Sequence, residues 1–453
     1  MMTLNKKWIL LLMIAILSLT ACSSKNDAPA TGSPAAEAEG KKTVVVSVMY
    51  VTPFLERAVQ KFEELYPDIH IELKGNPLGS EGMIKMMTEM ETEKYVQSVL
   101  TEAMSGKGAD LIDMSNLPED KLVDKQVLAN LDELMESDSS FDKKQYYQNI
   151  FQSPQTSEGL YSMPVTLMLD MIVGNPELLK KGNVTIDEGT WTWDQLKDIT
   201  KKLRAQEGED LYAFVGIPPE MLMTYFLEDN YRQFVLSNQQ ADFDSDAFRA
   251  LMQNIKAMYD EGLIKANEES QENEVRGSVG SGNRNKNSLF TYTLSNRAET
   301  LLTTLADSNS QMFQRPSISG QPQGWSYKSS NRFGINSKSN VQKEAWEFLK
   351  FMISEEVQSS DYLMGIPVHK DANKKKLQEA AQKLKATISD EKRLDERIEY
   401  AGNILEAAHP SFSIDKKIES IVQEEFESYM NGQKSADEVS KLIQNRVMTY
   451  LNE

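Results

Sequence analysis

The sequence predicts an α/β fold divided into more than one domain. Its 453 residues exceed what a single hydrophobic core usually supports, so two domains are expected. Runs of β-branched residues alternate along the chain with stretches whose apolar residues recur at helical spacing, and this alternation is typical of α/β proteins. Hydrophobic residues make up 40% of the chain and charged residues 26%, which is the composition of an ordinary folded protein.

The first segment predicts an export signal rather than part of the fold. Lys6 and Lys7 precede an apolar run over residues 8–19, which is too short to span a bilayer and fits the core of a signal peptide. The run ends in Leu19-Thr20-Ala21-Cys22, which resembles the bacterial lipobox. That resemblance implies a lipoprotein signal peptide over residues 1–21, cleavage before Cys22 and lipidation of the Cys22 thiol. Two acyl chains on one residue suffice for stable anchoring.

Residues 22–42 predict a flexible tether. The stretch 23–40 contains no large apolar residue, so it cannot bury enough surface to fold. The chain has a single cysteine, which excludes an intrachain disulfide. We therefore expect a folded body anchored through lipid at the extracytoplasmic face of a cell membrane.

The folded body opens with a predicted β-α-β unit. Residues 44–48 form a β-branched run suited to a buried strand, and residues 69–73 form a second one. Between them, Thr52 can cap a helix that has Pro53 in its first turn, and Pro67 terminates that helix.

Further strands and helices follow in alternation. Residues 108–114 and 160–165 predict strands, and the first has polar residues at its carboxyl end, where open α/β sheets place their ligands. Thr192-Trp193-Asp194-Gln195 predicts a helix that opens with a capping box, and Ser435 with Glu438 predicts another. Residues 414–429 carry apolar side chains at helical spacing, and Asn431-Gly432 ends that helix.

Charge and motif content exclude several classes of function. The formal net charge of −19 argues against nucleic-acid binding, because contact with phosphates requires a cationic surface. The three histidines, His70, His369 and His409, lack metal-ligand spacing, so we expect no metal and no cofactor. Lipidation consumes Cys22, and no nucleophile or acid–base motif is visible elsewhere in the sequence. We therefore expect a protein that is not an enzyme.

Several short motifs follow the lipobox in a characteristic order along the chain. They are Phe62-Glu63-Glu64-Leu65-Tyr66-Pro67-Asp68-Ile69, Ser105-Gly106-Lys107-Gly108-Ala109-Asp110-Leu111, Tyr161-Ser162-Met163-Pro164-Val165, Gly174-Asn175-Pro176-Glu177-Leu178-Leu179, Thr192-Trp193-Asp194-Gln195-Leu196, Ala345-Trp346-Glu347-Phe348-Leu349-Lys350-Phe351 and Gly365-Ile366-Pro367-Val368. Together they resemble the extracellular solute-binding proteins of family 1, the maltose-binding-protein type. The resemblance covers roughly residues 43–451.

This resemblance implies a two-lobed, type II periplasmic-binding-protein-like fold with a ligand cleft between lobes that are joined by a multi-crossing hinge. It implies an N-terminal lobe from residues 43–166 and 308–340, and a C-terminal lobe from residues 167–307 and 341–453. The resemblance implies two kinds of partner. One is a small-molecule solute, expected to be a carbohydrate such as an oligosaccharide, and the other is the permease subunits of an ABC transporter. The protein itself is expected to be a monomer.

Candidate cleft residues follow from strand ends and from the resemblance. Sugar recognition uses flat aromatic faces against C–H surfaces, and amides, carboxylates or hydroxyls against sugar hydroxyls. Each residue chosen on this basis could instead serve packing or lie on the surface. Trp191, Trp193 and Trp346 are assigned to packing. The candidate ligand-binding residues are Tyr50, Thr52, Asp113, Ser115, Met168, Asp170, Glu220, Tyr225, Tyr292, Trp325 and Phe412.

Two other functions remain open at this point. A surface solute sensor or adhesion module could use the same fold and the same cleft to signal rather than to transport. A cell-surface hydrolase would need an acid–base or nucleophile constellation, which the sequence does not show. Neighbouring genes for permease subunits would favour transport, and a neighbouring histidine kinase would favour sensing.

Overall fold

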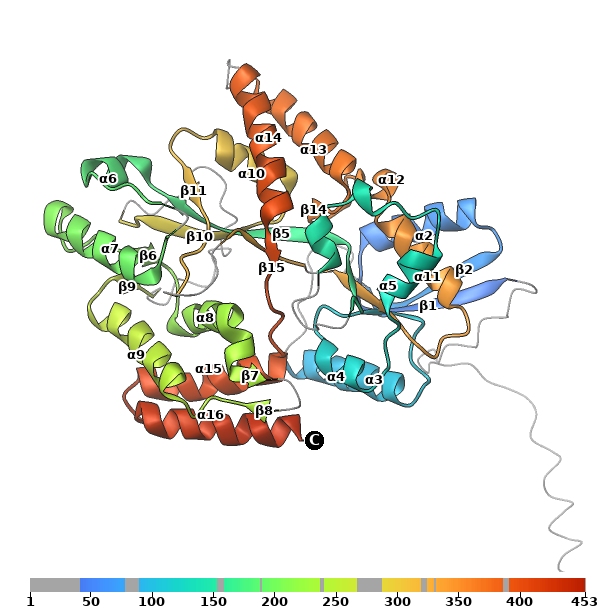
Figure 1. The fold of residues 1–453 in the computed structure, drawn as a ribbon, viewed down its shortest axis with the longest axis horizontal. Coiled ribbons are helices and arrows are strands. Elements are labelled where there is room, and N and C mark those ends of the chain that lie inside the picture. The colour runs from blue at the N-terminus through green and yellow to red at the C-terminus, as the bar shows by residue number, and fades with distance from the viewer. Residues whose placement is uncertain are drawn as a thin grey trace, which may run out of the picture. The chain divides into compact units, whose positions relative to one another are not determined.

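Two mixed β-sheets, each covered by helices, organise the folded part of the chain (Figure 1). The computed structural model describes residues 41–77, 89–152, 159–187, 190–236, 240–266, 287–318, 324–329, 331–385 and 391–452. Contacts divide the chain into Met1–Lys41 and Lys42–Glu453, and the second unit holds both sheets. The predicted signal peptide, Cys22 and all but the end of the predicted tether lie outside the described residues. Within them, no helix is long and apolar enough to cross a membrane.

The first sheet has the strand order β2-β1-β3-β13-β4. Strand β1 pairs in parallel with β2 and β3, and β13 runs antiparallel to β3 and β4. The predicted strands are therefore confirmed as elements, although that over 108–114 shortens to three residues and that over 160–165 to two. The bounds are β1 (Lys42–Val51), β2 (Ile69–Pro77), β3 (Leu111–Asp113), β4 (Met163–Pro164) and β13 (Arg332–Ile335).

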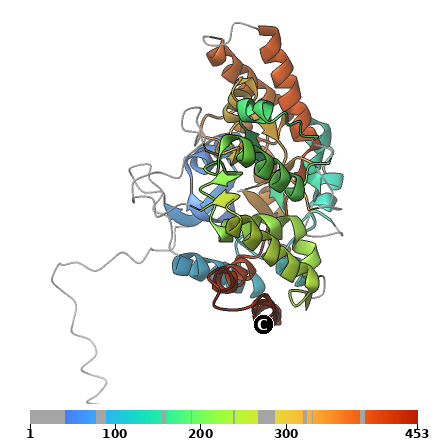
Figure 2. The same cartoon turned by 90° about the vertical axis from the view of Figure 1, so that its left-hand side faces the viewer.

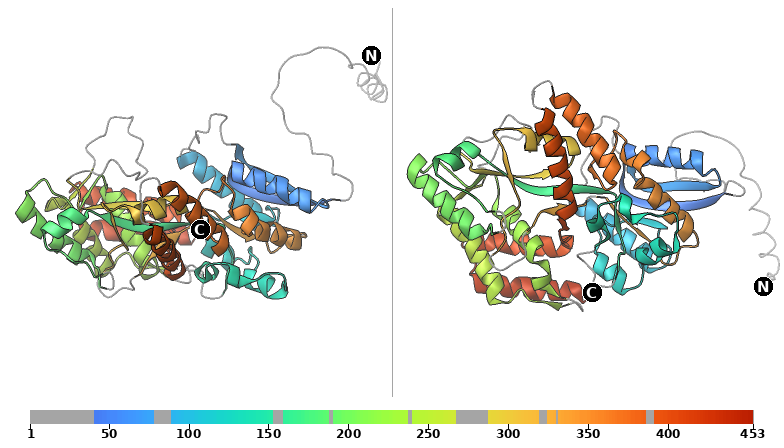
Figure 3. Two further views of the ribbon diagram at one scale, coloured as in Figure 1. Left: turned by 90° about the horizontal axis from the view of Figure 1, so that it is seen from above. Right: turned by 45° about the horizontal axis from the view of Figure 1, so that its top comes forward.

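The second sheet is built around β5, a strand that is buried along its length except at Met168. Its main path is β10-β5-β12-β15, and β11 and β14 also pair with β5. Because β5 follows β4 after one residue, it carries the chain from the first sheet directly into the second (Figure 3). The bounds are β5 (Thr166–Gly174), β10 (Phe290–Ser295), β11 (Gln311–Phe313), β12 (Ser326–Lys328), β14 (Ile366–Pro367) and β15 (His409–Pro410).

Helices and short strands complete the fold around these sheets. Helices α15 and α16 pack side by side against α8 and α9, as the view from the side shows (Figure 2). The helices are α2 (Pro53–Leu65), α3 (Glu89–Met104), α4 (Glu119–Asp124), α5 (Leu131–Ser137), α6 (Pro176–Lys181), α7 (Trp193–Glu207), α8 (Pro219–Phe234), α9 (Asp246–Asp260), α10 (Ala298–Ala306), α11 (Gln342–Met352), α12 (Glu355–Gln358), α13 (Lys370–Leu384), α14 (Glu391–Ala407), α15 (Lys416–Met430) and α16 (Ala436–Leu451). The remaining elements are η1 (Lys143–Gln145), η2 (Gln148–Phe151), β6 (Phe214–Val215), β7 (Val235–Leu236), β8 (Gln240–Ala241) and β9 (Ile264–Lys265).

Local sequence signals set several helix ends. The Thr52 side chain accepts a hydrogen bond from the Leu55 amide at the start of α2, as its position before Pro53 predicts. Both predicted capping boxes form, at α7 and at α16. The α15 helix ends at Met430, and Gly432 just beyond it has a φ of +69°, a left-handed conformation that glycine adopts without strain.

The apolar cores follow the two sheets. One cluster packs around the first sheet and continues along β5, and a second cluster packs α7, α8, α9, α15 and α16 together. A smaller third cluster joins α3 and α4 to β3. Trp191, Trp193 and Trp346 are all buried in these clusters, so their assignment to packing is confirmed.

The chain passes between the two sheets more than once. After β5, the segment that contains β11 and β12 pairs with the second sheet, and β13 then returns to the first. Helix α11 packs against β1, β13 and α2 beside the first sheet, and β14 and β15 pair again with the second. These crossings provide several connections about which two lobes can move. The lobe boundaries inferred from the sequence stay a prediction.

Candidate functional site

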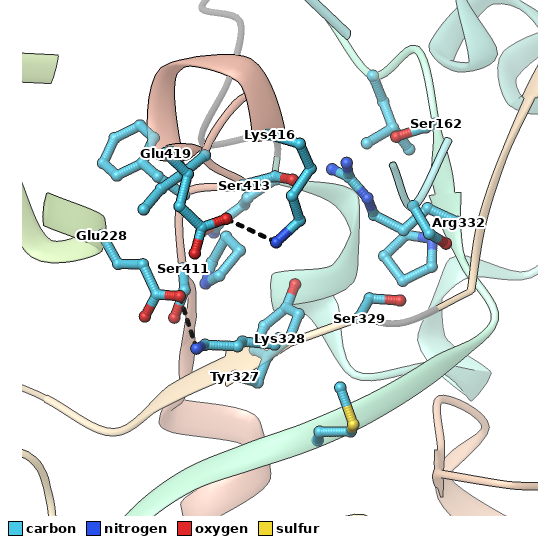
Figure 4. Close-up of a pocket in the computed structure, with 18 residues that line it drawn as sticks. Ser162, Glu228, Tyr327, Lys328, Ser329, Arg332, Ser411, Ser413, Lys416 and Glu419 are labelled. Carbon is cyan, nitrogen blue, oxygen red and sulfur yellow. Dashed lines mark hydrogen bonds and ion pairs between the residues drawn. The ribbon is translucent and has the colours of Figure 1, made fainter. Parts of the chain in front are cut away.

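A cavity of about 220 Å³ lies where residues from both sheets meet helix α15 (Figure 4). Its wall receives Ser162 and Pro164 from the first sheet, Met168 and Lys328 from the second, and Glu228 from α8. The ends of short strands and the start of a helix thus place polar side chains around one space. Polar and charged lining residues are Ser115, Gln152, Ser162, Glu228, Tyr327, Lys328, Ser329, Arg332, Ser411, Ser413, Lys416 and Glu419.

On the first-sheet side, a buried ion pair fixes Arg332, an arginine of the lining. The Arg332 Nη1 lies 2.9 Å from Glu119 Oε2, and both side chains are largely buried. Ser162 Oγ donates to the other carboxylate oxygen of Glu119 at 3.0 Å. Strand β13 and helix α4 therefore hold this guanidinium at the cavity wall in a fixed orientation.

A second carboxylate on the same side, Asp113, has a different environment. Ser115 donates both its backbone amide, at 3.0 Å, and its hydroxyl, at 2.5 Å, to Asp113 Oδ1. Burial raises the pKa of Asp113 to about 6, although the hydrogen bonds from Ser115 and the charge of Arg332 act to lower it. Because Ser115 lines the cavity, Asp113 orients a hydroxyl that faces the site.

On the second-sheet side, Glu228 and Lys328 form an ion pair at the cavity wall. Lys328 Nζ donates to Glu228 Oε1 at 2.6 Å, and Arg315 Nη1 donates to the other oxygen of Glu228 at 3.2 Å. Arg315 also pairs with Asp229. Burial raises the pKa of Glu228, and the charges of Lys328 and Arg315 act to lower it. Two cations thus compensate one deeply buried carboxylate at the edge of the site.

Behind this pair lies a second layer of hydrogen bonds centred on Asp170. Tyr292 Oη donates to Asp170 Oδ1 at 2.5 Å, and Ser411 Oγ donates to Asp170 Oδ2 at 3.4 Å. The rings of Tyr225 and Tyr292 stack with centroids 3.9 Å apart. The Lys328 ammonium lies 5.7 Å from the centre of the Tyr225 ring. This layer limits the freedom of both Ser411 and Lys328 at the cavity wall.

Helix α15 closes the cavity with a pair of its own. Asp415 caps α15, because its side chain accepts from the amides of Lys417 and Ile418. Lys416 Nζ then lies 2.7 Å from Glu419 Oε2, one helical turn away (Figure 4). Phe412 and Ser413, just before the helix, add an aromatic ring and a hydroxyl to the lining.

The arrangement favours a neutral, hydroxyl-rich ligand. Each cation in the lining, Lys328, Arg332 and Lys416, has a carboxylate partner within 3 Å, so no bare charge faces the cavity from these residues. Paired carboxylates and serine hydroxyls can still accept hydrogen bonds, and the ammonium and guanidinium groups can still donate them. Among the described residues, no cluster of three or more His, Cys, Asp or Glu side chains could hold a metal ion.

Three of the residues chosen from the sequence line this cavity: Ser115, Met168 and Phe412. Four more lie directly behind residues of the lining. Asp113 accepts from Ser115, and Asp170 accepts from Ser411. Tyr292 bonds to Asp170 and stacks on Tyr225, which faces the Lys328 ammonium. The structure therefore brings seven of the eleven candidates to one region.

The other four candidates do not line the cavity. Thr52 caps α2, and Tyr50 lies at the end of β1, opposite Asn76 of β2. Glu220 lies in the first turn of α8. Trp325 is 8% exposed and belongs to the apolar core around β5. Contact between these four residues and a solute stays a prediction.

Sequence reasoning missed the charged members of the lining. Glu228 lies one helical turn after the candidate Tyr225, a spacing that places both on one face of α8. Lys328 and Ser329 follow Trp325 within four residues, and Ser411 and Ser413 flank the candidate Phe412. Arg332 opens β13, seven residues after the candidate Trp325. Their closeness in sequence to the chosen candidates was the signal that could have identified these lining residues.

A family comparison bears on this site directly. The sequence model of the family described as bacterial extracellular solute-binding protein matches residues 50–359, well over half of the chain. The chain belongs to this family. The match begins at the end of β1 and includes β2 to β13, and with them most of the described cavity wall. Strands β14 and β15 and helices α13 to α16 follow the matched part.

Solved structures of solute-binding proteins share this fold at low sequence identity. The sugar-binding protein MalE from Xanthomonas citri superimposes with a TM-score of 0.62 and 16% identity, covering 91% of this chain and 98% of that one. The cyclic α-maltosyl-1,6-maltose binding protein from Arthrobacter globiformis gives 0.57 and 14%, with 91% and 99% covered. A sugar transporter protein from Rhizobium etli, in an open conformation, gives 0.56 and 15%, with 89% and 98% covered. The solute-binding fold, with two lobes about a cleft, is therefore that of this chain.

Proposed function

We propose that this protein captures a neutral saccharide in the cavity between its lobes and delivers it to the permease of an ABC importer. The observation that carries the proposal is the lining: among its described residues, each lysine and arginine is paired with a carboxylate, and five are serines. A charged ligand would find no uncompensated opposite charge on these paired side chains. Sugar hydroxyls can bond to them as they stand.

The serine hydroxyls support this assignment individually. Ser115, Ser162 and Ser411 each donate to a carboxylate behind the wall. A hydroxyl that donates its proton to the protein keeps lone pairs with which it can accept from a ligand hydroxyl. Tyr327 and Phe412 supply aromatic surface within the same lining, which suits the C–H faces of a sugar ring.

The family relatives point to the same chemistry. Three similar solved structures hold maltose, cycloalternan and tagatose, respectively, as bound molecules. All three are neutral polyhydroxy compounds. The importer partner, the monomeric state and the absence of turnover are inferred for this chain from its family.

A thermal-shift screen tests the proposal. The panel contains maltose, maltotriose, a cyclic malto-oligosaccharide and tagatose, with glucuronate and glucosamine as charged counterparts. A neutral saccharide at a hundred times its Kd should stabilise the native state by about 2.7 kcal/mol, seen as a rise in Tm. Stabilisation by glucuronate or glucosamine alone would contradict a neutral ligand. Recovery of the bound saccharide chemically unchanged is expected from a protein that binds without turnover.

We further propose that the folded body is held at the cell surface through lipid on Cys22. The support is the sequence Leu19-Thr20-Ala21-Cys22 at the end of an apolar run, followed by a stretch without large apolar residues. A Cys22→Ser variant should lose metabolic labelling by radioactive palmitate and collect as precursor or in the medium. Normal labelling of that variant would exclude the anchor at Cys22.

A further inference from the structure

Side chains of α3 and α4 contact side chains of α8, α15 and α16 beyond the edge of the cavity. Arg232 Nη2 of α8 lies 3.2 Å from Asp120 Oδ1 of α4. Lys417 Nζ of α15 lies 3.2 Å from Glu93 Oε1 of α3. Figure 1 shows α4 next to the C-terminal end of α16. Helices α3 and α4 belong to the predicted N-terminal lobe, and α8, α15 and α16 belong to the predicted C-terminal lobe. These contacts therefore connect the two predicted lobes and require them to be close together.

The two ion pairs differ in burial. The side chains of Glu93 and Lys417 are 56% and 50% exposed, whereas those of Asp120 and Arg232 are 37% and 31% exposed. Burial raises the pKa of Asp120 to about 6, and the charge of Arg232 opposes this rise. The contact with Arg232 thus shields part of the Asp120 carboxylate from water, and Arg232 is a cation that compensates its charge.

The other charged groups around Asp120 increase the need for Arg232. On its own helix, Glu119 and Asp124 both act to raise the pKa of Asp120. From α8, Tyr231 is coupled electrostatically to Asp120, and Asp415 at the start of α15 is coupled to Tyr231. The ammonium of Lys121 of α4 lies 5.3 Å from the centre of the Tyr450 ring. Among the described residues, Arg232 is therefore the cation recorded within ion-pair distance of this carboxylate.

We propose that Arg232 sets the affinity for solute without contacting it, by neutralising Asp120 when the two lobes close. The inference rests on the proposed function, because it concerns the closure that holds a solute in the cavity. In the open form, water solvates Asp120. In the closed form, Arg232 replaces part of that water, so removing Arg232 disfavours closure without removing a side chain of the cavity lining. Arg232 is not part of that lining.

The test measures closure directly and needs no identified solute. Cysteines introduced as Lys125→Cys on the α4 side and Lys441→Cys on α16 carry spin labels, in the full chain with Cys22→Ser, since Cys22 is the only native cysteine. Pulsed electron resonance then gives the distribution of distances between the lobes. At pH 7.5, Arg232→Gln should lower the ratio of closed to open molecules about three- to tenfold. This magnitude lies between the effects of breaking an exposed and a buried ion pair, because the Asp120–Arg232 pair is partly exposed.

Two comparisons separate this role from a merely structural one. Asp120→Asn combined with Arg232→Gln should restore the ratio to near that of the unmutated pair, because no buried charge is left. At pH 5, Asp120 is protonated in the closed form, so Arg232→Gln alone should have little effect. Lys417→Gln, which breaks the exposed pair with Glu93, is the matched control and should change the ratio less than twofold.

Each alternative has a distinct result. The Arg232 guanidinium also lies 5.8 Å from the centre of the Phe412 ring, so it could act through that ring of the lining. In that case Asp120→Asn would fail to restore closure and the pH would not matter, which would overturn the proposal. Equal distance distributions for all variants at both pH values would overturn it as well. A failure of the saccharide screen would leave these distances unaffected, so the two proposals fail separately.

Discussion

Two lysine–glutamate pairs line the same cavity, and their surroundings differ. Glu228 and Lys328 come from α8 and β12, with side chains 9% and 22% exposed, and Arg315 bonds to the same carboxylate. Glu419 and Lys416 lie one turn apart on α15, and the lysine is 58% exposed. The first pair joins two elements far apart in sequence and is held in place, whereas the lysine of the second can move into solvent. The comparison shows that the same kind of ion pair, lysine with glutamate, can be rigid at one place in a binding site and adjustable at another.

Removing the buried carboxylate should give the largest effect. Glu228→Gln leaves Lys328 partly buried without its partner, while Arg315 keeps Asp229. We expect a loss of about 2–4 kcal/mol in the free energy of unfolding, because breaking one side of a buried pair leaves an uncompensated charge. Urea denaturation at pH 7.5 measures this loss. A change below about 0.5 kcal/mol would show that the two pairs are energetically alike.

Asp113 is a third carboxylate to compare with Glu228 and Glu419. Its hydrogen bonds come from the amide and hydroxyl of Ser115 rather than from a lysine. Its pKa in the folded protein, about 6, is above the ordinary value of about 3.9. The folded protein therefore binds this proton more tightly than the unfolded chain, so the contribution of Asp113 to stability is present at pH 4 and is lost as pH rises towards 6.

Asp113→Asn should remove that pH dependence. The amide oxygen can still accept from Ser115, so the local hydrogen bonds persist. Relative to the unmutated protein, the variant should gain about 1–2 kcal/mol in stability between pH 4.5 and pH 7.5. Asp120 and Asp229 also have pKa values raised to about 6, mainly by burial, but they are present in both proteins and cancel in the difference. A difference independent of pH would contradict the assignment.

The exposed pair should give the smallest effect. Lys416→Gln removes a lysine whose side chain is mostly in solvent, and Glu419 keeps its hydrogen bond from Thr224. We expect a change in stability below about 0.5 kcal/mol, with a measurable loss of saccharide affinity as the main consequence. Denaturation and calorimetric titration of the same preparation separate the two quantities. A loss of stability as large as that of Glu228→Gln would remove the distinction between the pairs.

The site shows which features a single sequence reveals. Ser115 was found because it follows a short apolar strand, and Phe412 because an aromatic residue stands in a segment resembling a known family. Helix caps such as Thr52 and the box at Thr192 depend on residues three positions apart, so the sequence was enough to predict them. These are local signals, and the structure confirms the helices they predict.

The charged network could not be found in this way. Glu228 and Lys328 are separated by 100 positions, and Glu228 and Arg315 by 87. Their pairing depends on how β5, β12 and α8 meet in three dimensions, and the 68 acidic residues of the chain give no sign of which one is buried. Trp325, in contrast, is a residue that the sequence nominated but that does not line the cavity. It was chosen as an aromatic face for a sugar, but its neighbours Tyr327 and Lys328 are the residues that reach the cavity.

The most direct test of the central claim is a crystal structure of the protein with the saccharide that stabilises it most in the thermal-shift screen. We expect density for that saccharide in the cavity of Figure 4, with sugar hydroxyls within about 3.2 Å of the Glu228–Lys328 pair and of at least one lining serine. Both lysine–glutamate pairs of the lining should remain intact. A saccharide bound elsewhere while this cavity stays empty would contradict the account, even if the protein binds sugar.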